Sequence, residues 1–204
     1  MNEIVVVGIA GFAAALVDGS LGMGFGPTSS SILLSSGISP VGVSATVNIA
    51  KVVTGLAGGV SHWRFGNVDW RLVRRLAIPG AFGALIGAVV LANVDGDRLR
   101  PMLAALLAVI GVRILVRFRQ PIAVPALPAG SECPTPGVEI AGAVGGLTNG
   151  MIGAWGPVVT PYLLHRRIAP RIVVGSVNTA EIAVAFVAAG SLITSSAGVD
   201  PAIV

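Results

Sequence analysis

Charged residues are scarce in this chain, and two reactive residue types are almost missing. Only 11% of its 204 residues are Asp, Glu, Lys or Arg, whereas a soluble domain carries about 25%. The sequence contains a single lysine, Lys51, and a single cysteine, Cys133. One cysteine excludes an internal disulfide, and without a Cys/His cluster the sequence indicates no metal site and no cofactor. The low charge argues against a soluble domain.

Apolar residues take the place of the missing charge. They make up 54% of the sequence, and the mean hydropathy is +0.89. The apolar runs are long and do not alternate with polar residues, which predicts an all-α integral membrane protein surrounded by lipid. The net charge of +4 comes from arginines placed between the apolar runs. This pattern is typical of membrane topology signals, and we expect no nucleic-acid partner.

The first apolar run is interrupted by the glycine-rich stretch Asp18–Pro27. Each glycine costs about 1 kcal/mol relative to alanine inside a helix, and proline is favoured in the first turn of a new helix. The stretch therefore predicts a helix, a break, and a half-helix that begins at Pro27. The backbone N–H groups of Thr28, Ser29 and Ser30 would then point into the break. A helix N-terminus of this kind attracts anions.

The same pattern recurs at an offset of 130 residues. Asn149–Pro157 interrupts a second apolar run, Pro27 matches Pro157 (157 − 27 = 130), and Lys51 falls opposite Glu181 (181 − 51 = 130). Two interrupted segments at matching places in two halves are typical of a transporter binding site. The alternative is a glycine-rich surface that only packs helices together.

The repeats suggest a fold of two inverted units, each opening with a Gly/Pro-broken re-entrant hairpin. The expected organisation is a first repeat over 1–117 (hairpin 4–36, spans 41–61, 76–92 and 99–116), a Pro-rich linker over 118–136, and a second repeat over 137–204 (hairpin 138–164, span 172–194). The second repeat lacks counterparts of the third and fourth segments of the first. We expect either a shorter member of its family or a truncated chain.

The arginines predict an orientation in the membrane. If both broken segments are re-entrant, nearly all arginines fall on one face, and only Arg98 and Arg100 fall on the other. Loops rich in arginine are cytoplasmic. The N-terminus is therefore expected outside.

The glycine-rich break followed by proline, the turn Gly37–Pro40, the helix of Asn48 and the stretch Gly66–Trp70 together resemble the sulfite exporter TauE/SafE family, of the toluene sulfonate uptake permease group. The resemblance covers nearly the whole chain. It implies a multi-pass permease of the bacterial inner membrane that moves sulfur-containing anions such as sulfite, sulfoacetate or organosulfonates, coupled to an ion gradient.

Lys51 is the leading candidate for binding an anion, because an ionisable residue in the middle of a span is costly and functional by default. Asn48 lies on the same helical face. An alternative of equal weight is that Lys51 pairs with Glu181 and holds the repeats together. The full expected substrate site comprises Gly24, Gly26, Thr28, Ser29, Asn48, Lys51, Gly156 and Asn178.

Two carboxylates are candidates for coupling or ion pairing. Glu181 is a hypothetical proton site, since burial and a nearby cation act in opposite directions on the pKa of a carboxyl group. Asp18 either binds a cation or, as we favour, caps backbone N–H groups. The leading function is a secondary transporter, with an anion channel as the alternative. An intramembrane enzyme is less favoured, because no histidine accompanies these carboxylates.

Overall fold

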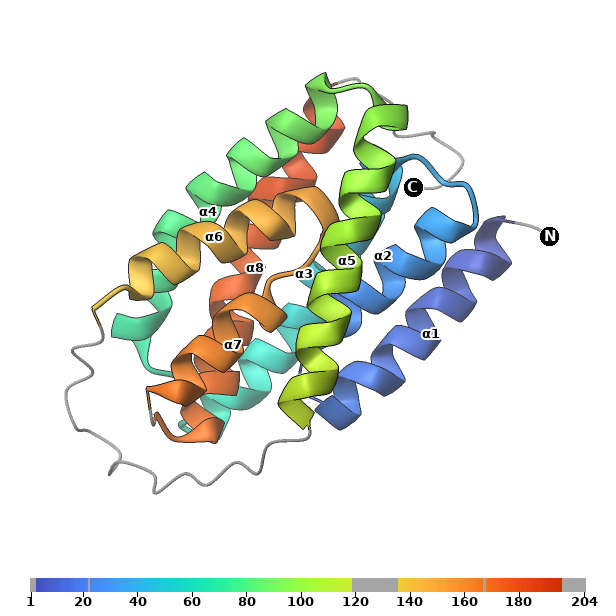
Figure 1. Ribbon diagram of the computed structural model, residues 1–204. Helices are drawn as coiled ribbons and strands as arrows, with labels where there is room; N and C mark the ends of the chain where they lie inside the picture. Colours follow the sequence, from blue (N-terminus) through green and yellow to red (C-terminus); the bar gives the residue numbers. More distant parts are fainter. Residues whose placement is uncertain (1–2, 22, 119–135, 167, 196–204) are drawn as a thin grey trace.

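The computed structural model describes residues 3–21, 23–118, 136–166 and 168–195, and within these ranges the chain forms helices and turns without a strand (Figure 1). The helices are α1 (Glu3–Leu21), α2 (Phe25–Ser35), α3 (Pro40–Arg64), α4 (Trp70–Asn93), α5 (Gly96–Phe118), α6 (Val138–Ile152), α7 (Gly156–His165) and α8 (Pro170–Thr194). The prediction of an all-α protein is confirmed. Residues 119–135 of the expected linker lie outside the described residues.

Four helices are long and apolar enough to cross a membrane, judged by length and composition. They are α3, α4, most of α5, and α8. The short helices α2 and α7 have 11 and 10 residues. At 1.5 Å per residue each reaches only about 16 Å, roughly half of the 30 Å hydrocarbon layer. Neither short helix can cross the membrane alone.

Each short helix folds back beside the helix that precedes it. In the second pair, the Tyr162 hydroxyl at the end of α7 donates to the Pro136 carbonyl oxygen before α6 at 2.6 Å, and Arg166 donates to the same oxygen at 3.4 Å. The segment therefore leaves the bundle where it entered. Gly153 makes the reversal possible, since its φ of 67° is left-handed. Figure 1 shows α1 and α2 side by side and running in opposite directions.

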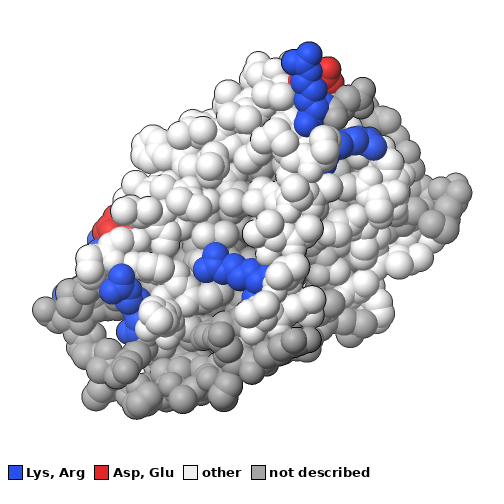
Figure 2. Space-filling view, in the orientation of Figure 1, with Lys and Arg blue, Asp and Glu red and all other residues white. Residues whose placement is uncertain are grey.

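The two hairpins open at opposite ends of the bundle. Arg100 donates to the Gly37 carbonyl oxygen at 3.0 Å, which places the exit of α2 beside the start of α5. At the other end, Arg75 of α4 pairs with Glu139 of α6 at 2.6 Å. The face of the molecule in Figure 2 is largely uncharged. The helix ends and the turn on the Glu139 side of the bundle carry Arg64, Arg71, Arg74, Arg75, Arg113, Arg166 and Arg171.

The helix boundaries repeat at the offset seen in the sequence. α3 and α8 begin 130 residues apart (170 − 40) and end 130 residues apart (194 − 64). All four long helices extend beyond the expected spans. The largest difference is in α4, which starts at Trp70 instead of 76, because the Asp69 carboxylate accepts the Arg71 and Leu72 N–H groups and caps the helix there. The expected start of the first half-helix at Pro27 is also corrected, since α2 begins at Phe25.

Glycines bring α4 and α6 into backbone contact. A Cβ atom on Gly146 would overlap the Gly80 carbonyl oxygen, and one on Gly83 would overlap the Ala143 carbonyl oxygen. Apolar burial drives little association between helices in lipid, so such close approach supplies much of the packing energy. The α4–α6 contact therefore fixes the second hairpin to the spanning helices.

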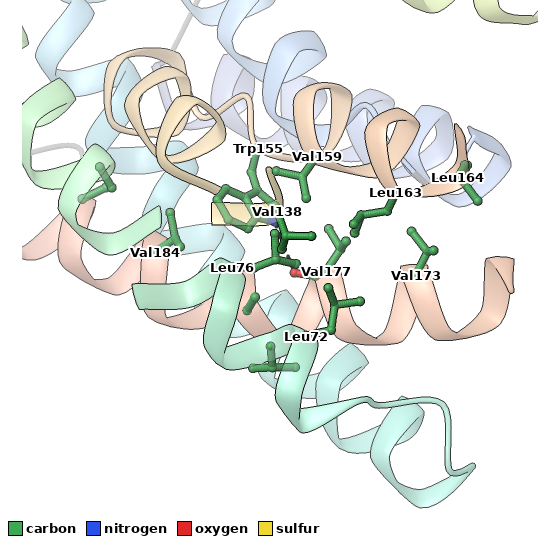
Figure 3. Packing of buried hydrophobic residues seen from close by; sticks show 14 residues of the cluster. Leu72, Leu76, Val138, Trp155, Val159, Leu163, Leu164, Val173, Val177 and Val184 are labelled. Atoms are coloured by element: carbon green, nitrogen blue, oxygen red, sulfur yellow. Dashed lines mark hydrogen bonds between the residues drawn. The ribbon is translucent and has the colours of Figure 1, made fainter. Parts of the chain in front are cut away.

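Trp155 anchors the second break in the main core (Figure 3). Its ring is fully buried, and its indole N–H donates to the Val177 carbonyl oxygen of α8 at 3.2 Å. A Cβ on Gly80 would lie 2.8 Å from the ring, so α4 also presses on it. The position of the chain between α6 and α7 is thus set by both neighbouring helices.

We expect Gly146→Ala to destabilise the protein by about 1–3 kcal/mol, because the added methyl group meets backbone that cannot move aside. The matched control is Gly190→Ala in α8, where an added Cβ would have no heavy atom of another described element within 4 Å. The control should be neutral or stabilising by up to about 1 kcal/mol, since alanine favours helix. Thermal unfolding in detergent compares the two, and equal melting temperatures would contradict the packing argument.

Candidate functional site

The breaks of the two hairpins meet inside the bundle. Gly26, in the first turn of α2, lies so close to Gly153 that a Cβ there would overlap the Gly153 carbonyl oxygen. From the other side, a Cβ on Gly156 would come within 3.3 Å of the Met23 Cβ. Since 153 − 23 and 156 − 26 both equal 130, the second contact is the counterpart of the first with the two repeats exchanged.

Lys51 reaches this junction from the middle of α3. Its side chain is 6% exposed, and its Nζ atom donates to Asn149 Oδ1 at 3.1 Å, to the Gly153 carbonyl oxygen at 2.5 Å and to Glu181 Oε1 at 2.5 Å. An ammonium group has three N–H donors. All three have an acceptor, so the protein itself supplies a complete set of oxygens around the buried charge.

Glu181 completes the site from α8, which packs along α3. Its side chain is 16% exposed, and the ion pair with Lys51 joins the two positions that match at the offset of 130. The pairing alternative drawn from the sequence is present in the structure. The Lys51 charge is therefore neutralised internally in this conformation, and it is not open to a ligand.

Polar side chains surround the pair and satisfy the end of α6. The Asn48 side-chain amide donates to the Asn149 carbonyl oxygen at 3.1 Å. In return, Asn48 Oδ1 accepts an N–H of the Asn149 side-chain amide at 2.6 Å. Ser44 donates to the Gly150 carbonyl oxygen at 2.8 Å, and Ser30 to that of Ile152 at 2.7 Å. The last carbonyls of a helix have no partner within it. Here α2 and α3 provide partners for the Gly150 and Ile152 oxygens, while the Asn149 oxygen also accepts the Gly153 N–H. Lys51 lies at the negative end of the helix dipole.

Asp18 caps the first break. Its Oδ1 accepts the backbone N–H groups of Gly24 at 2.8 Å and Phe25 at 3.2 Å. This is the capping role that the sequence favoured over cation binding. The expectation for Thr28 is wrong, because its N–H donates to the Gly24 carbonyl oxygen at 3.1 Å and does not point into the break.

The structure brings only part of the predicted site together. Gly26, Asn48, Lys51 and Glu181 converge at the junction. Ser29 is 3% exposed, and its hydroxyl has no hydrogen-bond partner among the described residues. The remaining predicted residues, Gly24, Thr28, Gly156 and Asn178, have no hydrogen bond to the Lys51 ammonium in the described structure.

Sequence reasoning missed Ser44, Asn149 and Gly153. Ser44, Asn48 and Lys51 are spaced four and three residues apart, which places them on one face of α3 and could have identified Ser44. Asn149 opens the second broken stretch, so its place in the sequence was a signal as well. Gly153 acts through its carbonyl oxygen, which no side-chain pattern reveals.

We expect Lys51→Met to destabilise the protein by about 3–5 kcal/mol, because Glu181 is left as a buried charge without its partner. The double variant Lys51→Met/Glu181→Leu removes both charges and should recover most of that loss. Unfolding of the single and double variants forms a double-mutant cycle. Additive losses would contradict an energetically coupled pair.

Comparison with known proteins gives the family. A family model described as "Sulfite exporter TauE/SafE" matches residues 7–204. A Bacillus subtilis (strain 168) protein named "Probable membrane transporter protein YtnM" is 41% identical over an alignment of length 203, which covers 96% of this chain and 66% of that relative. The chain thus spans just under two thirds of the relative's length, and no solved structure matches significantly. As its glycine-rich motifs predicted, the chain belongs to the TauE/SafE sulfite exporter family.

Proposed function

We propose that the protein is a secondary transporter that moves sulfur-containing anions, such as sulfite, sulfoacetate or organosulfonates, across the bacterial inner membrane. The observation that carries the proposal is the placement of Lys51, a buried cation at the meeting point of two broken hairpins. Membership of the TauE/SafE family and the name of the Bacillus subtilis relative support transport. The choice of sulfur anions rests on the family description.

A buried ion pair in the middle of two spanning helices calls for a functional explanation. Charged groups within a membrane are costly, and they mark substrate or ion pathways by default. In transporters built from repeats of opposite orientation, the substrate site lies where interrupted helices meet near the bilayer midplane. The hairpins of this chain open at opposite ends of the bundle and meet at Lys51. We therefore propose an inverted repeat with the anion site at this junction.

The packing favours a carrier over an open anion channel. Gly26 is pressed against Gly153, and every donor of Lys51 is engaged. An anion oxygen can bind the ammonium only after one of these donor contacts is broken. Such a rearrangement is an obligatory step of alternating access, whereas a channel needs a continuous path.

A ligand panel tests this function in the purified protein. Sulfite, sulfoacetate, taurine, an aromatic sulfonate, sulfate, phosphate and acetate are compared by thermal shift. We expect a dose-dependent rise in melting temperature with sulfite or a sulfonate, because binding stabilises the folded state by mass action. The folded double variant Lys51→Met/Glu181→Leu should lose the response, while Arg98→Ala, an exposed cation of α5, should retain it. A flat response across the panel would remove the anion site.

Site-directed labelling tests the proposed orientation. In a Cys133→Ser background, Ser36→Cys lies at the end of the bundle near Arg100, and Phe65→Cys lies at the arginine-rich end. Both positions are exposed, and Phe65 is 80% exposed. Because arginine-rich loops are cytoplasmic, an impermeant maleimide added to intact cells should label Ser36→Cys and spare Phe65→Cys. The reverse pattern would invert the proposed topology.

A further inference from the structure

We propose that a bound anion and the Glu181 carboxylate compete for the same N–H donor of Lys51, so that each anion binds together with one proton taken up by Glu181. The inference rests on the proposed anion transport. It deepens that function by naming the proton as the coupling ion and monovalent anions as the substrate class.

The competition follows from the number of donors. Lys51 has three N–H groups, and Asn149 Oδ1, the Gly153 carbonyl oxygen and Glu181 Oε1 accept them all. Asn149 and Gly153 belong to the second hairpin, where Trp155 and the α4 contact hold the backbone. Glu181 is attached by a side chain that can rotate away without moving a helix. The anion oxygen therefore replaces Glu181 Oε1.

The charge balance then requires a proton. Paired Lys51 and Glu181 are neutral together, and an added monovalent anion would leave a net charge of −1 inside the bundle. A buried charge without a partner costs several kcal/mol. If the displaced Glu181 takes one proton from water, the anion, the ammonium and the neutral carboxylic acid again sum to zero. A divalent anion would leave one negative charge uncompensated, so the site selects monovalent anions. Among the proposed substrates this favours hydrogensulfite and monosulfonates over the sulfoacetate dianion.

Other charged groups of the described chain stand apart from this exchange. Asp18 of α1 is tied to the N–H groups of Gly24 and Phe25. On α6, Glu139 lies at the opposite end of the helix and pairs with Arg75 of α4. The described part of α2 carries no charged residue, and α7 has only His165, in its last turn. Glu181 is thus the carboxylate, among the described residues, that reaches the ammonium.

Calorimetry counts the proton directly. Methanesulfonate is titrated into the wild-type protein in detergent, in buffers that differ in ionisation enthalpy, because its own charge stays constant over the working pH range. At pH values where Glu181 of the anion-free protein is deprotonated, we expect uptake of one proton per bound anion. Over the same pH range the affinity for the anion should weaken about tenfold per pH unit. Glu181→Gln should bind without proton uptake and with affinity independent of pH. Glu139→Gln, the matched control at an exposed carboxylate, should behave as wild type.

The outcomes separate this inference from the function on which it rests. Binding by the wild-type protein without proton uptake overturns the competition and leaves anion transport standing. A pH dependence that persists in Glu181→Gln overturns it as well. If no anion binds the folded wild type at any pH, both proposals fail together. The wild-type proton count decides the question even if Glu181→Gln does not fold.

Discussion

The rest of the structure depends on the need of one ammonium group for three oxygens away from water. An unpaired buried cation costs several kcal/mol, so the chain must deliver acceptors to Lys51 from separate elements. Asn149 and Gly153 come from the second hairpin, and Glu181 comes from α8. The left-handed turn at Gly153 directs its carbonyl oxygen toward α3, and the absence of a side chain at Gly26 lets the first hairpin close over it. Each half of the chain is needed to satisfy a single charge.

The same junction resolves the problem of a helix that ends inside the bundle. The last carbonyls of α6 would be unpaired in a region without water, which costs several kcal/mol per group. Ser30 and Ser44 donate to the Ile152 and Gly150 oxygens, and Asn48 adds a second donor to the Asn149 oxygen, which also accepts the Gly153 N–H. Lys51 adds a positive charge where the helix dipole is negative. Breaking a helix and burying a cation are each unfavourable alone. Placed together, each removes much of the cost of the other.

The sequence predicted the architecture better than the contacts of the site. Low charge and long apolar runs predicted the helical membrane fold, and the offset of 130 predicted that Lys51 faces Glu181. Hydropathy missed the first turn of α4, because arginines occupy a turn that Asp69 caps. Gly153 could not be predicted, since its role depends on a backbone dihedral and a carbonyl direction. Thr28 was misjudged because α2 begins two residues before Pro27, so its N–H is already bonded within the helix.

The repeats share a scaffold but differ in charge where they touch. Identical residues at positions 51 and 181 would place two lysines, or two glutamates, against each other, and like charges at that distance repel strongly. Lys51 and Glu181 avoid this, and their neighbours differ too: Ser44 corresponds to Val174, and Asn149 to Gly19. The carbonyl-rich end of α6 therefore faces the cation, while the matching end of α1 is bridged by its own Asp18. An anion arriving at the junction therefore meets two unequal hairpins, and the second hairpin supplies the two acceptors that remain on Lys51 when Glu181 is displaced.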